Sequence, residues 1–95
     1  MAEFDERVAA LTARFTGEAI GSMAVIEACL TRRAWADLST QCHSLAGRAG
    51  MFGQASLGEA ARAVEEAIDA KAPATVIKPL ALDLLDQLRA LRQER

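Results

Sequence analysis

The chemistry that this sequence can offer centres on its one histidine, His43. A neutral imidazole keeps a lone pair on one ring nitrogen, so it can act as a nucleophile, a base or a metal ligand. Zinc sites need three or four clustered ligands, and the chain adds only Cys29 and Cys42 to this histidine. Successive side chains on a helix diverge by about 100°, so Cys42 and Ser44 are poorly placed to pair with His43 in nucleophilic catalysis. The sequence therefore favours an imidazole that acts alone.

Small residues precede and follow His43 on the helix that we predict around it. The apolar residues of this helix form a buried stripe, and His43 points roughly 130° away from the centre of that stripe. Gly47 lies in the helix interior, where glycine costs about 1 kcal/mol relative to alanine. Two interpretations remain open: Gly47 allows a close contact with another helix, or it clears space for a bulky group or a partner protein beside the imidazole. The stripe consists of Trp35, Leu38, Cys42, Leu45, Ala49 and Phe52.

The fold class predicted from the sequence is all-α, because Ala, Leu, Glu and Arg dominate and apolar residues recur with the helical period. Ser56 and Glu59 have the spacing of a capping box, whereas Pro79 leaves the start of the last helix open. Short connections favour an antiparallel four-helix bundle with an additional short N-terminal helix, set off by a break or a bend at Thr16-Gly17. The helices are expected at about Glu3–Phe15, Gly17–Thr31 and Ala34–Met51, then from Gln54 or Ser56 to Ala70, and from Pro73 or somewhat later to Arg92.

Composition argues against several classes of function. The 95 residues fit one domain, residues 1–95, with enough apolar side chains for a packed core. The formal net charge of -2 does not suit a protein that binds nucleic-acid phosphates. No run of about 20 apolar residues could span a membrane, and the N-terminus is acidic where a signal peptide would be basic. We therefore expect a cytoplasmic, monomeric domain that binds neither nucleic acid nor membrane.

The segment that begins at His43 resembles the phosphorylated segment of histidine-containing phosphotransfer (HPt) domains, the helical-bundle phosphocarriers of two-component phosphorelays. The family pattern places an aliphatic residue and two glycines at fixed distances after the histidine. A leucine-bearing helix that ends in an aliphatic–glutamate pair then follows. The resemblance covers about Trp35 to Ile68 by motif, and nearly the whole chain by helix order and length. The matching residues are His43, Leu45, Gly47, Gly53, Leu57, Ala61, Val64 and Glu65.

The resemblance implies roles for single residues. His43 would accept a phosphoryl group, and Glu65 would hydrogen-bond the other imidazole nitrogen. Three residues after the histidine the family usually has a lysine, where this chain has Ala46. Arg48 projects about 140° around the helix from His43, so it is a poor substitute. Arg62, one turn before Glu65 on the same flank, is the residue that we expect to compensate the phosphoryl charge; the alternatives are an ordinary ion pair with Glu65 or a lysine supplied by the partner.

The resemblance also implies a phosphocarrier and not an enzyme, with neither a nucleotide site nor a metal site of its own. Its partners would be response-regulator receiver domains and a hybrid or sensor histidine kinase, and the receiver domain would bind the Mg²⁺ that transfer requires. The alternative, which the missing lysine leaves open, is a helical module that docks a receiver or kinase domain without being phosphorylated. The predicted docking surface consists of Ser39, Ala46, Gly47, Gly50, Met51 and Met23.

Overall fold

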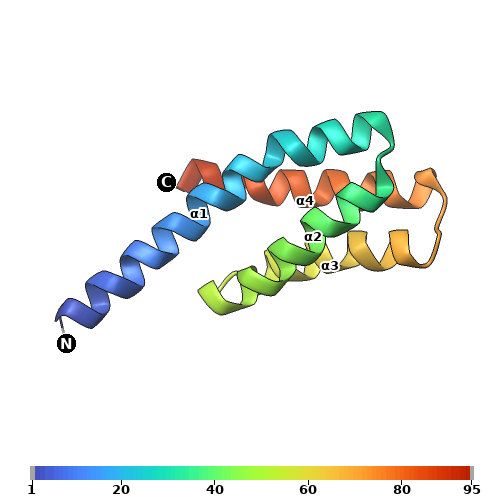
Figure 1. Cartoon of the computed structure of the whole chain (residues 1–95). Coiled ribbons are helices and arrows are strands. Elements are labelled where there is room, and N and C mark those ends of the chain that lie inside the picture. The colour runs from blue at the N-terminus through green and yellow to red at the C-terminus, as the bar shows by residue number, and fades with distance from the viewer. Residues whose placement is uncertain (1, 95) are drawn as a thin grey trace.

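The computed structural model describes residues 2–94, and for residues 2–4 the backbone alone. Four α-helices run alternately in opposite directions (Figure 1), and no strand is present between residues 2 and 94. α1 and α3 each pack against both α2 and α4. Of the helices described, none is both long and apolar enough to cross a membrane. The helices are α1 (Ala2–Arg32), α2 (Trp35–Ala49), α3 (Ala55–Asp69) and α4 (Ala74–Glu94), with a short 3₁₀ helix, η1 (Gly50–Phe52), after α2.

One hydrophobic core fills the space between the four helices. The helical period brings its side chains onto one face of each helix, as the apolar stripes of the sequence predict. On α2, His43 lies on the face opposite the buried one, and this face therefore points outward. The largest side chains that are fully buried are Ile26, Leu38, Leu45, Val64, Ile77, Leu84, Leu85 and Leu88.

The first helix differs from the sequence prediction. α1 is continuous over 31 residues, so the expected short N-terminal helix, set off at Thr16-Gly17, is wrong. The hydroxyl of Thr16 donates to the carbonyl of Thr12 within the helix. A single glycine costs about 1 kcal/mol there, and helix-forming residues on both sides outweigh it. The N-terminal half of α1 therefore projects beyond the shorter helices (Figure 1), and the molecule is 49 Å long.

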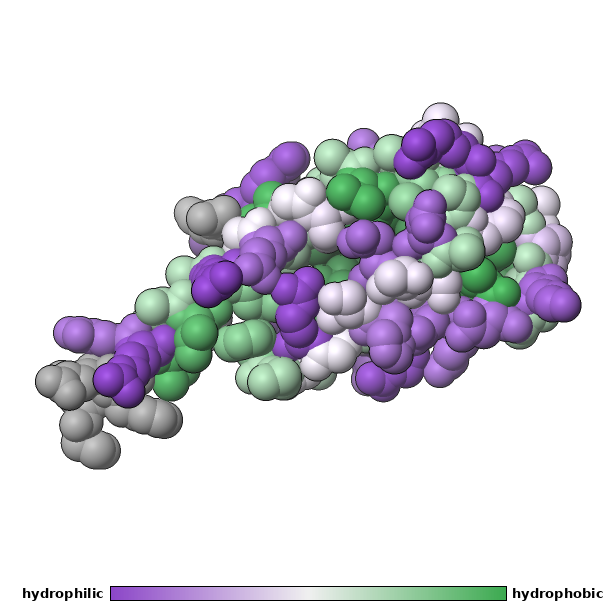
Figure 2. Space-filling model, in the orientation of Figure 1, coloured by the Kyte–Doolittle hydropathy of each residue, from purple (hydrophilic) through white to green (hydrophobic). Residues whose placement is uncertain are grey.

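The projecting half of α1 carries apolar side chains beyond the end of the core. Val8 and Leu11 are 45% and 53% exposed, on the face of α1 that buries Phe15 further along. Figure 2 shows hydrophobic atoms along this part of the molecule, between hydrophilic ones. Phe15 stacks on Phe52 with ring centroids 5.0 Å apart, which joins α1 to the 3₁₀ helix after α2. The bundle proper thus ends at this aromatic pair.

The structure gives the detail of three helix ends. α2 gives way to η1 (Gly50–Phe52), and Gly53 follows with a φ of 74°, a left-handed conformation that glycine adopts without penalty. α3 begins at Ala55 with Gln54 at the N-cap position, so Ser56 lies inside the helix and the predicted capping box does not form. The hydroxyl of Ser56 donates instead to Gln87 on α4. α4 continues through Pro79.

Gly58 lets α3 approach α2 closely. A Cβ atom at this position would lie 3.4 Å from the Cβ of Ala49 and 3.6 Å from the carbonyl oxygen of Ala46. Side chains larger than alanine would therefore push the two helices apart. The close contact fixes how α2 and α3, which carry His43 and Glu65, lie against each other.

Candidate functional site

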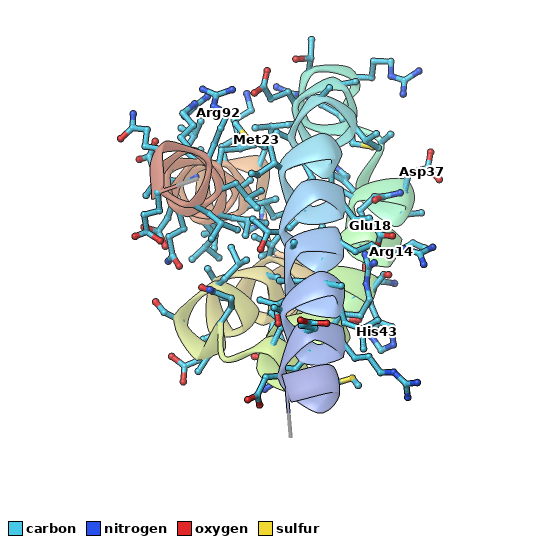
Figure 3. The ribbon with its side chains drawn as sticks, turned by 90° about the vertical axis from the view of Figure 1, so that its left-hand side faces the viewer. Arg14, Glu18, Met23, Asp37, His43 and Arg92 are labelled. Atoms are coloured by element: carbon cyan, nitrogen blue, oxygen red, sulfur yellow. The ribbon has the colours of Figure 1, made fainter. Side chains whose placement is uncertain are left out.

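His43 lies on the outer face of α2. Its neighbours in sequence, Cys42 and Leu45, are buried in the core, so the helical period directs His43 away from it. The His43 side chain is 78% exposed. Figure 3 shows it at the side of the bundle. The imidazole is therefore accessible to another molecule.

Glu65 of α3 holds the imidazole from one side. The Nδ1–H of His43 donates to Oε2 of Glu65 at 2.6 Å, so the contact that the sequence predicts is present. A carboxylate can only accept a hydrogen bond, which places the proton on Nδ1 and leaves the lone pair on Nε2. The Glu65 side chain is 19% exposed and lies between the two helices. The ring thus has a fixed orientation, a fixed tautomer and one free nucleophilic nitrogen.

A second polar pair lies one turn away along the same seam between α2 and α3. The hydroxyl of Ser39 donates to Oδ1 of Asp69 at 3.2 Å. Ser39 precedes His43 by four residues on α2, and Asp69 follows Glu65 by four residues on α3. This pair is not among the contacts predicted from the sequence. The shared spacing of four residues on two antiparallel helices is the signal that could have revealed it.

Ala46 and Arg62 occupy the next level of the seam. The antiparallel register that pairs His43 with Glu65 places Arg62 opposite Ala46, three residues further in each helix. Ala46 is 6% exposed and faces α3, so its predicted place on the docking surface is wrong. Arg62 is exposed, and none of the side chains of residues 5–94 forms a hydrogen bond or ion pair with it, Glu65 included.

The remaining residues of the predicted docking surface divide into two groups. Gly47, Gly50 and Met51 are exposed, and Met51 is 77% exposed. A Cβ atom at position 47 or 50 would meet no atom within 4 Å, so Gly47 does not serve a close contact within this chain. Met23 is 6% exposed and belongs to the core beside α4, so its predicted docking role is wrong. The helical period alone did not show that α4 covers this side of α1.

Arg48 is engaged on the other flank of α2, as its predicted direction requires. It forms an ion pair with Glu18 of α1, which also pairs with Arg14. The guanidinium carbon of Arg48 lies 6.0 Å from the centre of the Phe15 ring. Figure 3 shows Arg14 and Glu18 on the same side of the molecule as His43. Arg48 therefore contributes to the α1–α2 contact and is not a partner of the imidazole.

Cys42, which precedes His43, is unsuited to reaction. Burial, and to a lesser degree the Glu65 carboxylate and Cys29, raises the pKa of the Cys42 thiol from 9.0 to about 12. The thiol therefore stays protonated at neutral pH, and the thiolate that attacks or binds metal does not form. Within the described part of the chain, no three His, Cys, Asp or Glu side chains gather where they could hold a metal ion.

Comparison with family models gave a match over nearly the whole chain. The model of the family described as "Hpt domain" matches residues 5–94. The matched region contains His43, Glu65 and all four helices apart from the first residues of α1. No curated protein and no solved structure gave a match. Because the match covers nearly the whole length, the chain belongs to the Hpt domain family, whose members are phosphocarriers in the histidine phosphotransfer of two-component signalling.

Proposed function

We propose that this protein carries a phosphoryl group between receiver-domain aspartates, or between them and a histidine kinase, as phosphohistidine at His43. The observation that carries the proposal is an imidazole that is 78% exposed while its Nδ1 is held by Glu65 at 2.6 Å. In-line phosphoryl transfer depends on positioning and on an open approach to the attacking atom. A nucleophilic Nε2 on the exposed side of the ring meets both requirements.

Of this chain, only His43 takes part in the bonds that form and break during the transfer step. The lone pair of Nε2 forms the bond to phosphorus while the bond between phosphorus and the receiver's aspartyl oxygen breaks and leaves its electron pair on that oxygen. Nδ1 keeps its hydrogen, so the ring becomes positively charged, and the Glu65 carboxylate stabilises that charge. Transfer to a second receiver reverses these steps. We assign the Mg²⁺ ion to the receiver domain, and this chain supplies no cofactor.

Arg62 is our candidate for the charge that the family's lysine usually provides. A phosphoryl group adds a charge of about -1.5 to -2 at neutral pH. Arg62, on α3, lies opposite Ala46 of α2. It is exposed and has no ion-pair partner among the described side chains. Its planar guanidinium is suited to phosphate oxygens. We therefore propose that Arg62 approaches the phosphoryl group from α3 instead of from α2.

The docking surface that we propose surrounds His43 on the outer face of α2. It consists of Ser39, Gly47, Gly50 and Met51, with Ala46 and Met23 removed from the predicted set. The glycines leave the centre of this surface flat, and the flexible Met51 side chain adapts to different partners. Transient signalling complexes tend to have small contact surfaces, and these four residues form a small one. Receiver domains and a hybrid or sensor histidine kinase are the partners that we assign to it.

Replacement of Gly47 by leucine is expected to stabilise the fold while slowing transfer. Leucine favours helices over glycine by about 0.5–1 kcal/mol, and the space at position 47 is open. The new side chain projects into the path of the partner, so we expect transfer to fall roughly five- to tenfold. Urea unfolding and transfer rates measure the two effects. The control is Gly21→Leu on α1, where a Cβ atom would also have no neighbour within 4 Å. It should raise the free energy of unfolding by a similar amount and leave the transfer rate unchanged. Equal transfer rates for both variants would remove Gly47 from the docking surface.

The proposed function is tested by one transfer reaction. The protein is incubated with receiver domains carrying a radiolabelled phosphoryl group on their aspartate, and the labelled products are separated. We expect label on this chain that is lost in acid and retained in alkali, the behaviour of a nitrogen–phosphorus bond, and mass spectrometry should locate it at His43. Stable binding of receivers without any label would instead support the non-phosphorylated docking module.

A further inference from the structure

Asp69 lies one helical turn from the imidazole and its glutamate, on the α2–α3 seam. Its carboxylate accepts a hydrogen bond from Ser39, and this contact holds it against α2. Four residues of helix rise about 6 Å, which is the approximate spacing between the Asp69 and Glu65 levels. Side chains on a helix lean toward its N-terminus, so the imidazole of His43 lies over the turn that contains Ser39. Asp69, which contacts Ser39, therefore lies on the same side of the imidazole, toward the N-terminus of α2.

The stability of α3 does not explain an aspartate at this position. Asp69 is the last residue of α3. The C-terminus of a helix carries partial negative charge, so a carboxylate there is unfavourable and a basic residue is preferred. The exposed hydrogen bond from Ser39 offsets part of this cost. An aspartate at this helix position, held on the seam by Ser39, is placed to act on a group bound at His43.

Charged side chains of α3 lie along the seam on both sides of the imidazole. Glu65 contacts His43, Asp69 is held one turn away by Ser39, and Arg62 lies at the next level in the other direction. On α1, Glu18 pairs with Arg14 and also with Arg48 of α2, so its charge is already compensated. A group bound to Nε2 of His43 thus lies between a carboxylate one level toward the N-terminus of α2 and an arginine one level toward its C-terminus.

We propose, as a consequence of the proposed function, that Asp69 makes the phosphoryl group on His43 energetically unfavourable, so that the protein passes the group on instead of storing it. The phosphoryl group is a dianion or nearly so, and a fixed negative charge one helical turn away repels it. Arg62 acts in the opposite direction from the next level of the seam. The balance between these two residues sets how the phosphoryl group is distributed between His43 and a receiver.

The test is the equilibrium of transfer with a receiver that labels the wild-type chain in the reaction described above. Asp69→Asn keeps an oxygen that accepts from Ser39 but removes the charge. We expect the ratio of forward to reverse transfer rate constants toward His43 to rise about three- to tenfold. Arg62→Gln should lower the same ratio by a similar factor. Asp83→Asn is the matched control, because Asp83 also accepts a side-chain hydrogen bond but lies on α4.

Salt separates electrostatics from structure in this experiment. The Debye length is about 8–10 Å at physiological ionic strength and about 3 Å at 1 M, so the effect of Asp69→Asn should shrink at 1 M salt. A structural effect of the substitution would persist in salt and would overturn the proposal. An unchanged ratio in Asp69→Asn at low salt would also overturn it. If no receiver places label on wild-type His43, it is the proposed function that fails, and the two failures are thereby distinguished.

Discussion

Replacement of His43 by glutamine is expected to abolish phosphorylation of this protein. Glutamine has a similar size and polarity, but its amide nitrogen is not nucleophilic, so no bond to phosphorus forms. The side chain is 78% exposed, and we expect the free energy of unfolding to change by no more than about 0.5 kcal/mol. The measurement is the acid-labile label on the chain after incubation with a phosphorylated receiver, beside a urea unfolding curve.

The control for this variant is Ser44→Ala. Ser44 is the exposed neighbour of His43, and its hydroxyl is the nearest alternative acceptor in sequence. A serine phosphate is stable in acid and labile in alkali, so it differs from phosphohistidine in both tests. We expect full labelling of Ser44→Ala. Label that survives in His43→Gln would show that another residue accepts the phosphoryl group, and the proposed role of His43 would be wrong.

Replacement of Glu65 by alanine is expected to slow transfer by about 10–100-fold, the range usual for partners that orient a reactive imidazole. Without the carboxylate, the proton is no longer fixed on Nδ1 and the ring rotates more freely. The positive charge that the ring acquires on phosphorylation also loses its counter-charge. Single-turnover transfer from a phosphorylated receiver measures the effect. Folding should persist, since His43 remains solvated when Glu65 is removed.

Two further variants sharpen the test of Glu65. Glu65→Gln retains an oxygen that accepts from Nδ1 but lacks the charge, so its transfer rate should lie between those of the wild type and Glu65→Ala. Glu59→Ala removes an exposed carboxylate from the same helix, one that takes no part in the seam with α2, and should transfer at the wild-type rate. If Glu65→Ala transfers as fast as Glu59→Ala, the 2.6 Å contact has no role in the reaction.

The main elements of the site could be predicted because their signals are local. The spacing of Leu38, Cys42 and Leu45 defines the buried face of α2, and His43 is turned outward by the same period. The prediction of a contact between His43 and Glu65 came from the family motif, and the structure confirms that contact. The open space beside Gly47 is consistent with one of the two interpretations that the sequence left open.

Other expectations failed where the outcome depends on contacts between distant segments. The predicted docking surface includes Ala46 and Met23, yet both are buried, because α3 and α4 cover those sides of their helices. A break was expected at Thr16-Gly17, but α1 is continuous. A glycine weakens a helix locally, and whether the helix continues depends on the sum of the residues and contacts on both sides.

The sequence by itself determined which segments are helical and that His43 faces outward, since both follow from the spacing of apolar residues along one helix. Only the tertiary structure decided which carboxylates form hydrogen bonds with side chains of α2. The close approach of α3 at Gly58 is consistent with the register that pairs Glu65 with His43 and Asp69 with Ser39. That register joins residues far apart in the chain, so no local pattern specifies it, and packing between the helices selects it.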